Sequence, residues 1–161
     1  MGQIDFNKVW QNFVDTLTGH YVDFNGRVGR AQYWYFILVY VVIAIAVNIV
    51  AAVTTHALST LFALAMLLPN LGMTVRRLHD TNKPGIYVVI LLVPAVLTIL
   101  MGLVALATGP FGFLAFILFF ASLIWLIWLV AAGIMIYLCA QPGDAGDNQY
   151  GPPPPVWTPG A

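Results

Sequence analysis

Four long apolar runs, separated by short polar segments, make up most of the sequence. The runs cover about residues 34–53, 57–75, 86–107 and 113–138. An α-helix needs about 20 residues to cross the roughly 30 Å hydrocarbon core of a bilayer, and each run is close to that length or exceeds it. The runs are continuously apolar, whereas the strands of a membrane barrel alternate between apolar and polar positions. The pattern therefore predicts an all-α integral membrane protein that contains a four-transmembrane-helix bundle.

A shorter helix is predicted at residues 4–19, ahead of the first run. Its apolar residues recur at spacings of three and four, namely Phe6, Val9, Trp10, Phe13, Val14 and Leu17. This spacing places them on one stripe of an amphipathic helix. We expect the helix to lie on the membrane surface. The alternatives are a helix that packs against the protein's own loops and one that docks a partner.

The composition agrees with a membrane protein and excludes two other classes. Hydrophobic residues make up 61% of the 161 residues and charged residues only 7%, against about 25% charged in a typical globular domain. Twelve charged side chains cannot cover the exterior of a water-soluble fold of this size. Six basic and six acidic residues give a net charge of zero, so no basic excess points to nucleic acid. We therefore predict one membrane domain over residues 1–161, with membrane lipids as its immediate partners.

The basic residues are distributed asymmetrically. All six precede the first run or lie between the second and the third, at Lys8, Arg27, Arg30, Arg76, Arg77 and Lys83. The links at 54–57 and 108–110 contain neither lysine nor arginine. The positive-inside rule assigns the basic side to the cytoplasm, so both termini are predicted there.

Three polar clusters fall on that same predicted face: residues 21–36, 75–85 and the Gly/Pro-rich tail at 141–161. Their motifs are Phe24-x-Gly26-Arg27-x-x-Arg30-x-x-Tyr33-Trp34, then Pro69 followed by Arg76-Arg77-Leu78-His79-Asp80, and Gly146-x-Asn148-x-Tyr150-Gly151-Pro152. The three motifs, in this order, resemble the family of small bacterial inner-membrane proteins called domain of unknown function 805. Gly85, which ends the turn after Asp80, is counted with the motif residues. The family often has glycine at the position of Asn82, which leaves the shape of that turn open.

The resemblance implies a multi-span inner-membrane protein and no particular activity. From the residues, the cluster of Arg27, Arg30, Arg76, Arg77, His79 and Asp80 is the candidate site. Guanidinium groups bind phosphate through two parallel hydrogen bonds, which favours lipid headgroups or another anion as ligand. Generic anchoring at the headgroups is one alternative. Another is a structural role, in which Asp23 and Asp80 pair with the arginines and join two cytoplasmic loops. The tail either folds back over the arginines or stays undocked.

The leading functional hypothesis is a non-enzymatic protein whose arginine-rich face binds anionic lipid headgroups or a partner protein. A small transporter or channel subunit is the alternative, and it requires oligomerisation. A membrane-embedded enzyme using His79 and Asp80 is less favoured, because neighbouring residues on a helix do not face each other and no nucleophile is placed beside them. His20, His56 and His79 lack the paired spacing of metal ligands, so we predict neither metal nor cofactor. A homo-oligomer or a membrane protein partner is left open.

Overall fold

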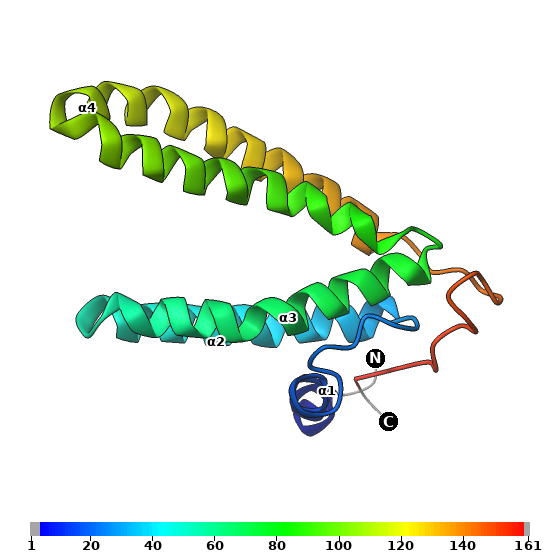
Figure 1. Ribbon diagram of the computed structural model, residues 1–161. Helices are drawn as coiled ribbons and strands as arrows, with labels where there is room; N and C mark the ends of the chain where they lie inside the picture. Colours follow the sequence, from blue (N-terminus) through cyan, green and yellow to red (C-terminus); the bar gives the residue numbers. More distant parts are fainter. Residues whose placement is uncertain (1–3, 160–161) are drawn as a thin grey trace. The chain divides into compact units, whose positions relative to one another are not determined.

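The computed structural model shows an all-helical protein (Figure 1). The structure describes residues 4–159, and of these it does not describe the side chains of 102, 105–119 and 121. The elements in order are α1 (Phe6–Thr18), α2 (Arg30–Val53), α3 (His56–Asp80), the short 3-10 helix η1 (Gly85–Val88) and α4 (Val89–Ala140). Within residues 4–159 the only β-type pairing is an isolated bridge between Asn148 and Gly151. The predicted all-α class is confirmed.

The chain forms two compact units, Met1–Gly85 with Gln141–Ala161, and Ile86–Ala140. The sequence places every charged residue in the first unit. That unit contains α1, α2, α3 and the tail, and the candidate site is built entirely within it. The predicted single-domain organisation stays a prediction.

In the first unit, α2 and α3 form an antiparallel hairpin whose two helices lie side by side (Figure 1). Thr55 caps the start of α3 by accepting a hydrogen bond from the backbone N–H of Ala57 at 3.3 Å. Tyr40 and Phe62 stack between the helices, with ring centroids 6.0 Å apart. Both helices are long and apolar enough to span a membrane, with mean hydropathies of 2.9 and 1.6. The first two predicted spans are therefore confirmed as helices of membrane-spanning length.

In the second unit, the two ends of α4 run side by side. The indole Nε1 of Trp128 lies 3.5 Å from Oγ1 of Thr98, although the two residues are 30 positions apart. Ser122–Ala140 has membrane-spanning length, while Gly85–Met101 is a shorter apolar helix. The side chains outside the described set include residues 102 and 105–107 of the third predicted span, the predicted link at 108–110, and residues 113–119 and 121 of the fourth predicted span. The described residues therefore contain three helices of membrane-spanning length, and the count of four spans stays a prediction.

The apolar stripe of α1 is divided between two environments. Val9 and Phe13 are buried, and Phe13 stacks on Phe36 of α2 with ring centroids 5.4 Å apart. Phe6 and Trp10, from the neighbouring part of the stripe, are 80% and 53% exposed. One part of the stripe thus packs on the helix α2, and not on a loop as one alternative had it. A second apolar part is left uncovered, and the location at the membrane surface stays a prediction.

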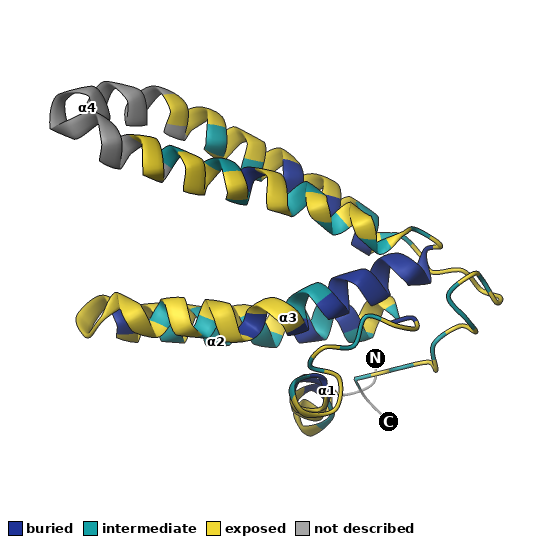
Figure 2. Ribbon diagram, viewed as in Figure 1, coloured by how far each residue is buried: buried dark blue, intermediate teal, exposed yellow. Residues whose placement is uncertain are grey.

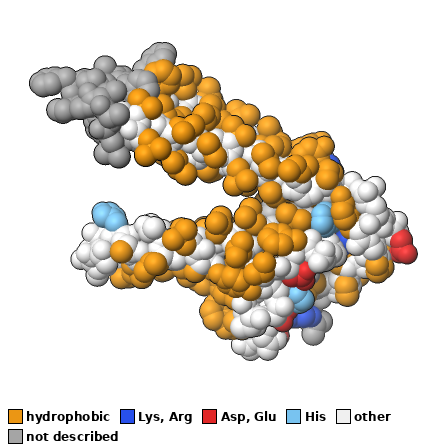
Figure 3. Space-filling view, viewed as in Figure 1, with side chains coloured by type: hydrophobic (Ala, Val, Ile, Leu, Met, Phe, Trp, Pro, Cys, Tyr) orange, Lys and Arg blue, Asp and Glu red, His pale blue; other side chains and the backbone are white. Residues whose placement is uncertain are grey.

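Burial is concentrated at one end of α3. Figure 2 shows its last turns in the colour of buried residues, while the rest of α2 and α3 is largely exposed. Hydrophobic side chains cover the exposed part, and the charged side chains visible in Figure 3 gather near the buried end. The helix continues to Asp80, beyond the predicted span end at 75, and so carries four of the six candidate site residues on its last turns.

Candidate functional site

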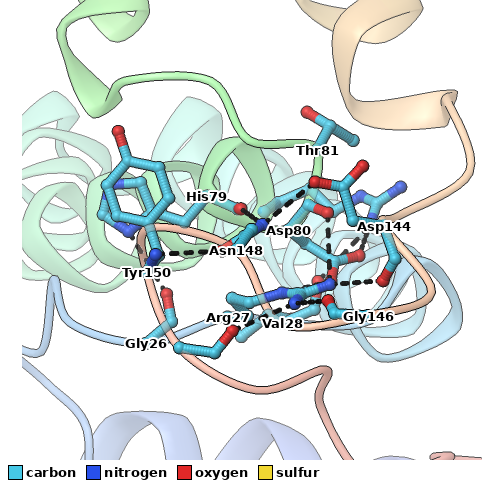
Figure 4. Close-up of polar contacts among 12 residues, drawn as sticks. Gly26, Arg27, Val28, His79, Asp80, Thr81, Asp144, Gly146, Asn148 and Tyr150 are labelled. Carbon is cyan, nitrogen blue, oxygen red and sulfur yellow. Dashed lines mark hydrogen bonds and ion pairs between the residues drawn. The ribbon is translucent and has the colours of Figure 1, made fainter.

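Asp80, the last residue of α3, binds two arginines at once (Figure 4). Arg27 donates from Nε to Oδ1 of Asp80 at 3.1 Å, and Arg77 donates from Nη1 to Oδ2. The side chains of Asp80, Arg27 and Arg77 are only 4%, 1% and 0% exposed. We call these three residues the hub. It is a buried ion cluster that contains two positive charges and one negative charge.

Two local features bring the arginines to Asp80. Arg77 lies three positions before Asp80 on α3, which is the spacing of neighbours on a helix surface. Arg27 comes from the segment between α1 and α2, where Gly26 adopts the left-handed backbone conformation at φ 77°. The next residue, Val28, donates its backbone N–H to the carbonyl of Arg76 at 3.1 Å. The hub thus fixes the segment before α2 to the end of α3.

The C-terminal tail closes the hub through its backbone carbonyl oxygens. Arg27 donates to the carbonyls of Asp144, Gly146 and Gly151 at 2.5, 2.8 and 3.1 Å, and Arg77 donates to the carbonyl of Gln141. The backbone N–H of Asp144 donates in return to the carbonyl of Asp80 at 2.8 Å. These carbonyl dipoles compensate the excess positive charge of a buried cluster. The interpretation that the tail folds back over the arginines is confirmed.

Gly143 is a functional position that the sequence analysis missed. A Cβ atom at this residue would overlap the carboxylate of Asp80, so the tail approaches the hub this closely only because the side chain is absent. Gly72 is a second such position, because a Cβ there would lie 2.7 Å from the carbonyl oxygen of Asp23. Neither residue belongs to the quoted motifs, and the only sequence signal for Gly143 was its place in a glycine-rich tail.

His79 binds the tail on the other side of α3's last turn. Its ring stacks on that of Tyr150, with centroids 3.7 Å apart and planes 5° from parallel. Its Nδ1 lies 3.2 Å from the carbonyl oxygen of Gly26, and its own carbonyl accepts from the side-chain amide of Asn148 at 2.9 Å. The Asp80 carboxylate is held by the arginines instead. The adjacent pair His79 and Asp80 therefore takes part in two separate sets of contacts.

The tail keeps its shape through a tight turn. Asn148 and Gly151 exchange backbone hydrogen bonds of 3.1 and 3.0 Å, and the side chain of Asn148 accepts from the backbone N–H of Tyr150 at 2.9 Å. Gly151 has φ 113°, which favours glycine. This turn presents the Tyr150 ring to His79 and the Gly151 carbonyl to Arg27. Pro152 follows the turn and is exposed.

The other motif residues support the same end of the bundle. Tyr33 is buried and meets Trp34 edge to face, with centroids 5.2 Å apart. Phe24 is half-buried, and Pro69 is fully buried inside α3. Gly85 lies against Val75, where a Cβ would come within 2.7 Å of a methyl carbon.

The turn after Asp80 requires a residue that tolerates a positive φ. Asn82 has φ 55°, and asparagine is among the residues that most readily replace glycine in this conformation. The presence of asparagine where the resemblance suggests glycine is therefore compatible with a left-handed turn.

Two candidate arginines lie outside the hub. Arg30 is exposed at the first position of α2. Arg76 forms an ion pair with Asp23, with Nη1 and Oδ2 3.5 Å apart, and its Nη2 lies 3.2 Å from the sulfur of Met73. Asp23 also accepts from the backbone N–H of Asn25 at 3.0 Å. The structure thus contains the two acid–base pairings of the structural hypothesis, at Asp80 and at Asp23.

Comparison with known proteins matches this chain to one family. The family described as "Protein of unknown function (DUF805)" matches residues 21–152. The chain belongs to this family. Among curated proteins, the inner membrane protein YhaI of Escherichia coli (strain K12) is 36% identical over 78 residues, or 47% of this chain and 66% of YhaI. The inner membrane protein YhaH of the same strain is 30% identical over 82 residues, or 47% of this chain and 68% of YhaH.

The match therefore spans slightly less than two thirds of YhaI, and no solved structure matches the chain. In this DUF805 protein the three sequence motifs meet in one place. Arg27 comes from the first motif and Asp80 from the second, and the carbonyls of Gly146 and Gly151 come from the third. The hub is where the motifs of the resemblance converge.

Proposed function

We propose that this DUF805 protein is a four-span inner-membrane protein with both termini in the cytoplasm, and that its cytoplasmic end binds anionic lipid headgroups without catalysing a reaction. The observation that carries the proposal is the uncovered apolar face of α1. The inner-membrane location is supported by the printed names of YhaI and YhaH and by the helices of membrane-spanning length among the described residues.

The faces of α1 fit a helix that lies in the headgroup layer beside its own bundle. At about 100° per residue, Phe6, Trp10 and Val14 fall on a stripe adjacent to that of Val9 and Phe13. The stripe of Val9 and Phe13 packs on α2, and the stripe of Phe6, Trp10 and Val14 is exposed. Large apolar side chains gathered on a surface indicate contact with a membrane or a partner. When an amphipathic helix lies at the leaflet surface, the lipids cover such a stripe. Tryptophan is enriched at the headgroup level.

The hub narrows the set of basic residues available to lipids. Arg27 and Arg77 are enclosed by protein and already bind Asp80 and the tail. Arg30 is exposed and Lys8 is half-exposed. Each basic residue near an anionic membrane surface adds about 1 kcal/mol of attraction. We therefore assign the hub a structural role and the surface around α1 the lipid contact.

The test of α1 uses a matched pair of neighbouring positions. Trp10→Cys and Gln11→Cys are made in a Cys139→Ala background, which removes the single natural cysteine, and each is labelled with an environment-sensitive fluorophore in anionic vesicles. We expect the label at position 10 to be quenched by nitroxide lipids and the label at position 11, on the exposed polar face, to be quenched by an aqueous agent. Equal aqueous quenching at both positions would contradict the proposal.

The topology is tested separately in spheroplasts. His56→Cys lies at the first residue of α3, next to the link from α2, and Asp147→Cys lies in the tail. With a membrane-impermeant thiol reagent, we expect labelling of position 56 in intact spheroplasts and of position 147 only after lysis. The reverse order would overturn the proposed orientation.

The transport and enzyme hypotheses have less support. The amide of Asn48, which lies within the apolar part of α2, donates to the carbonyl of Ala44 in its own helix at 2.8 Å. The sequence has no charged residue between 31 and 75 or between 84 and 143, whereas transporters commonly carry such residues within their spans. For an enzyme, His79 and Asp80 already have protein partners. Oligomerisation and a protein partner stay predictions.

A further inference from the structure

A cavity of about 290 Å³ lies beside the hub within the first unit. Five segments supply its walls: the end of α1, residues 20–28 between α1 and α2, the start of α2, the end of α3 and the tail from Pro154 to Trp157. The side chains that matter for the argument are Asp15, Thr16, Gln32, Arg76 and Trp157. Trp157 is held in place by contact with Tyr35, with ring centroids 5.5 Å apart.

Two buried arginines line this cavity, Arg27 and Arg76. Arg27 is compensated by Asp80 and the tail carbonyls, whereas Arg76 is poorly compensated. Its side chain is 9% exposed, yet its ion pair with Asp23 is 3.5 Å long and its other contact is to the sulfur of Met73, a weak acceptor. Its Nε is buried and has no hydrogen-bond partner among the described residues. A buried guanidinium usually has its donors satisfied by carboxylates and carbonyls, as Arg77 has nearby.

The acidic residue of the cavity is in a different environment. The Asp15 side chain is 67% exposed and lies 3.7 Å from His20. Water and salt screen an exposed charge far more than a buried one. Asp15 is screened, and Arg27 is already paired with Asp80. Arg76 is therefore the lining charge that is left to attract an anion.

We propose that this cavity binds a phosphate group through Arg76, and that the phosphate is that of a phospholipid headgroup. Guanidinium is the side-chain group best matched to phosphate oxygens, and the volume lies just below the usual range of about 300–1,000 Å³ for ligand pockets. The end of α1 forms one wall of the cavity through Asp15 and Thr16, and α1 is proposed to lie in the headgroup layer, where phosphate groups are abundant. This inference deepens the proposed function and rests on the location of α1 at the membrane.

The test measures binding to the full-length chain, purified and delipidated in a mild non-ionic detergent. The probes are dihexanoyl phosphatidylglycerol, inorganic phosphate, and dihexanoylglycerol, which lacks the phosphate. Gln32→Glu adds a negative charge to the cavity wall at the first turn of α2, where helix N-termini favour an acid. Gln11→Glu is the matched control, because it makes the same change on the exposed face of α1. Thermal unfolding confirms that both variants fold.

We expect Gln32→Glu to weaken phosphatidylglycerol binding about tenfold, as an added like charge in a partly buried site does. We expect Gln11→Glu to bind like the unchanged protein. Asp15→Asn removes the opposing charge and should tighten binding about twofold to threefold, a small effect because that carboxylate is exposed. Arg76→Lys keeps the charge but loses the planar fork, and should weaken binding severalfold.

The remaining outcomes distinguish a lipid phosphate from free phosphate. They also distinguish failure of the cavity proposal from failure of the proposed lipid contact at α1. Inorganic phosphate that binds as tightly as dihexanoyl phosphatidylglycerol would support the phosphate site and overturn a lipid as its source. Equal binding in Gln32→Glu and Gln11→Glu, or equally tight binding of dihexanoylglycerol, would overturn the site itself. Because this assay uses soluble probes in detergent, its failure leaves the fluorophore measurement at α1 unaffected, so the two proposals fail independently.

Discussion

The two ends of α3 are built in different ways. Along its first turns, the leucines at 61 and 64 are exposed by 65% and 62%, and the protein provides few neighbours for them. Along its last turns, Arg77 and Leu78 are completely buried. The first end presents apolar side chains that a bilayer covers, whereas the second end is covered by the segment before α2 and by the tail.

This difference separates two sources of stability. The apolar end is stabilised by the surrounding lipid, because transfer of apolar side chains out of lipid into water is unfavourable. The buried end depends on particular partners, because an ion removed from water is costly unless its charge and its hydrogen bonds are satisfied. Substitutions should therefore lower the stability of the protein strongly near the hub and only slightly along the lipid-facing turns.

The largest effect is expected for Asp80→Asn. This change leaves Arg27 and Arg77 as buried cations without a carboxylate, and removal of one partner from a buried ion pair costs about 3–5 kcal/mol. We expect a large drop in the thermal unfolding midpoint in detergent and rapid proteolysis of the released tail. The control is Asp147→Asn, which removes an exposed carboxylate of the same tail. Similar stability of the two variants would mean that the hub is not a structural centre.

A second pair of variants tests whether the tail must approach the hub closely. In Gly143→Ala the new methyl group overlaps the Asp80 carboxylate, so the tail must move away. We expect a loss of about 1–3 kcal/mol, typical of overpacking, and faster hydrogen exchange at residues 141–151. Gly146→Ala is the matched control, because nothing lies within 4 Å of a Cβ at that position. Equal exchange in the two variants would contradict the close approach.

The contact between His79 and Tyr150 should have a smaller effect. The parallel rings 3.7 Å apart contribute about 0.5–1.5 kcal/mol beyond their buried area. Tyr150→Ala removes this contact and should raise the proteolysis rate of the tail severalfold. Tyr150→Phe keeps the ring and should behave like the unchanged protein. If both variants lose protection alike, the hydroxyl group rather than the ring holds the tail.

The same contrast explains what the sequence could predict. The helices of α2 and α3 follow from continuous apolar runs, which are local features, and so does the amphipathic helix α1. The partners of the hub are not local, since Arg27 lies 53 positions from Asp80 and 117 from Asp144. From charge and spacing, only a few alternatives could be predicted for the partners of the hub arginines, and the docked tail was one of them. The role of Gly143 depends on where the tail lies, and no pattern within the tail indicates it.

At the lipid-facing end, Leu61→Ala and Leu64→Ala are expected to change stability by less than about 0.5 kcal/mol each, as exposed positions do. Lipid chains fill the space left by the shorter side chain, so no cavity forms. The measurement is the thermal midpoint in vesicles, where the bilayer is present. A loss of more than about 2 kcal/mol would show that a protein surface, and so a second copy or a partner, covers this face.

The smallest effect concerns the ion pair of Asp23 at the edge of the buried region. Burial acts to raise the pKa of Asp23, but the backbone N–H of Asn25, His20 and Arg76 lower it, and the net pKa lies below 3.8. Because the folded pKa is lower than the unfolded one, the stabilisation is complete above the unfolded pKa and is lost as the pH falls through the folded pKa. The carboxylate is partly exposed, so we expect only a slight fall in the thermal midpoint between about pH 5 and pH 3. Asp23→Asn should remove that fall while the rest of the acid profile persists. If Asp23→Asn shows the same fall in thermal midpoint as the unchanged protein, the acid sensitivity comes from other carboxylates and the ion pair of Asp23 with Arg76 does not contribute to it.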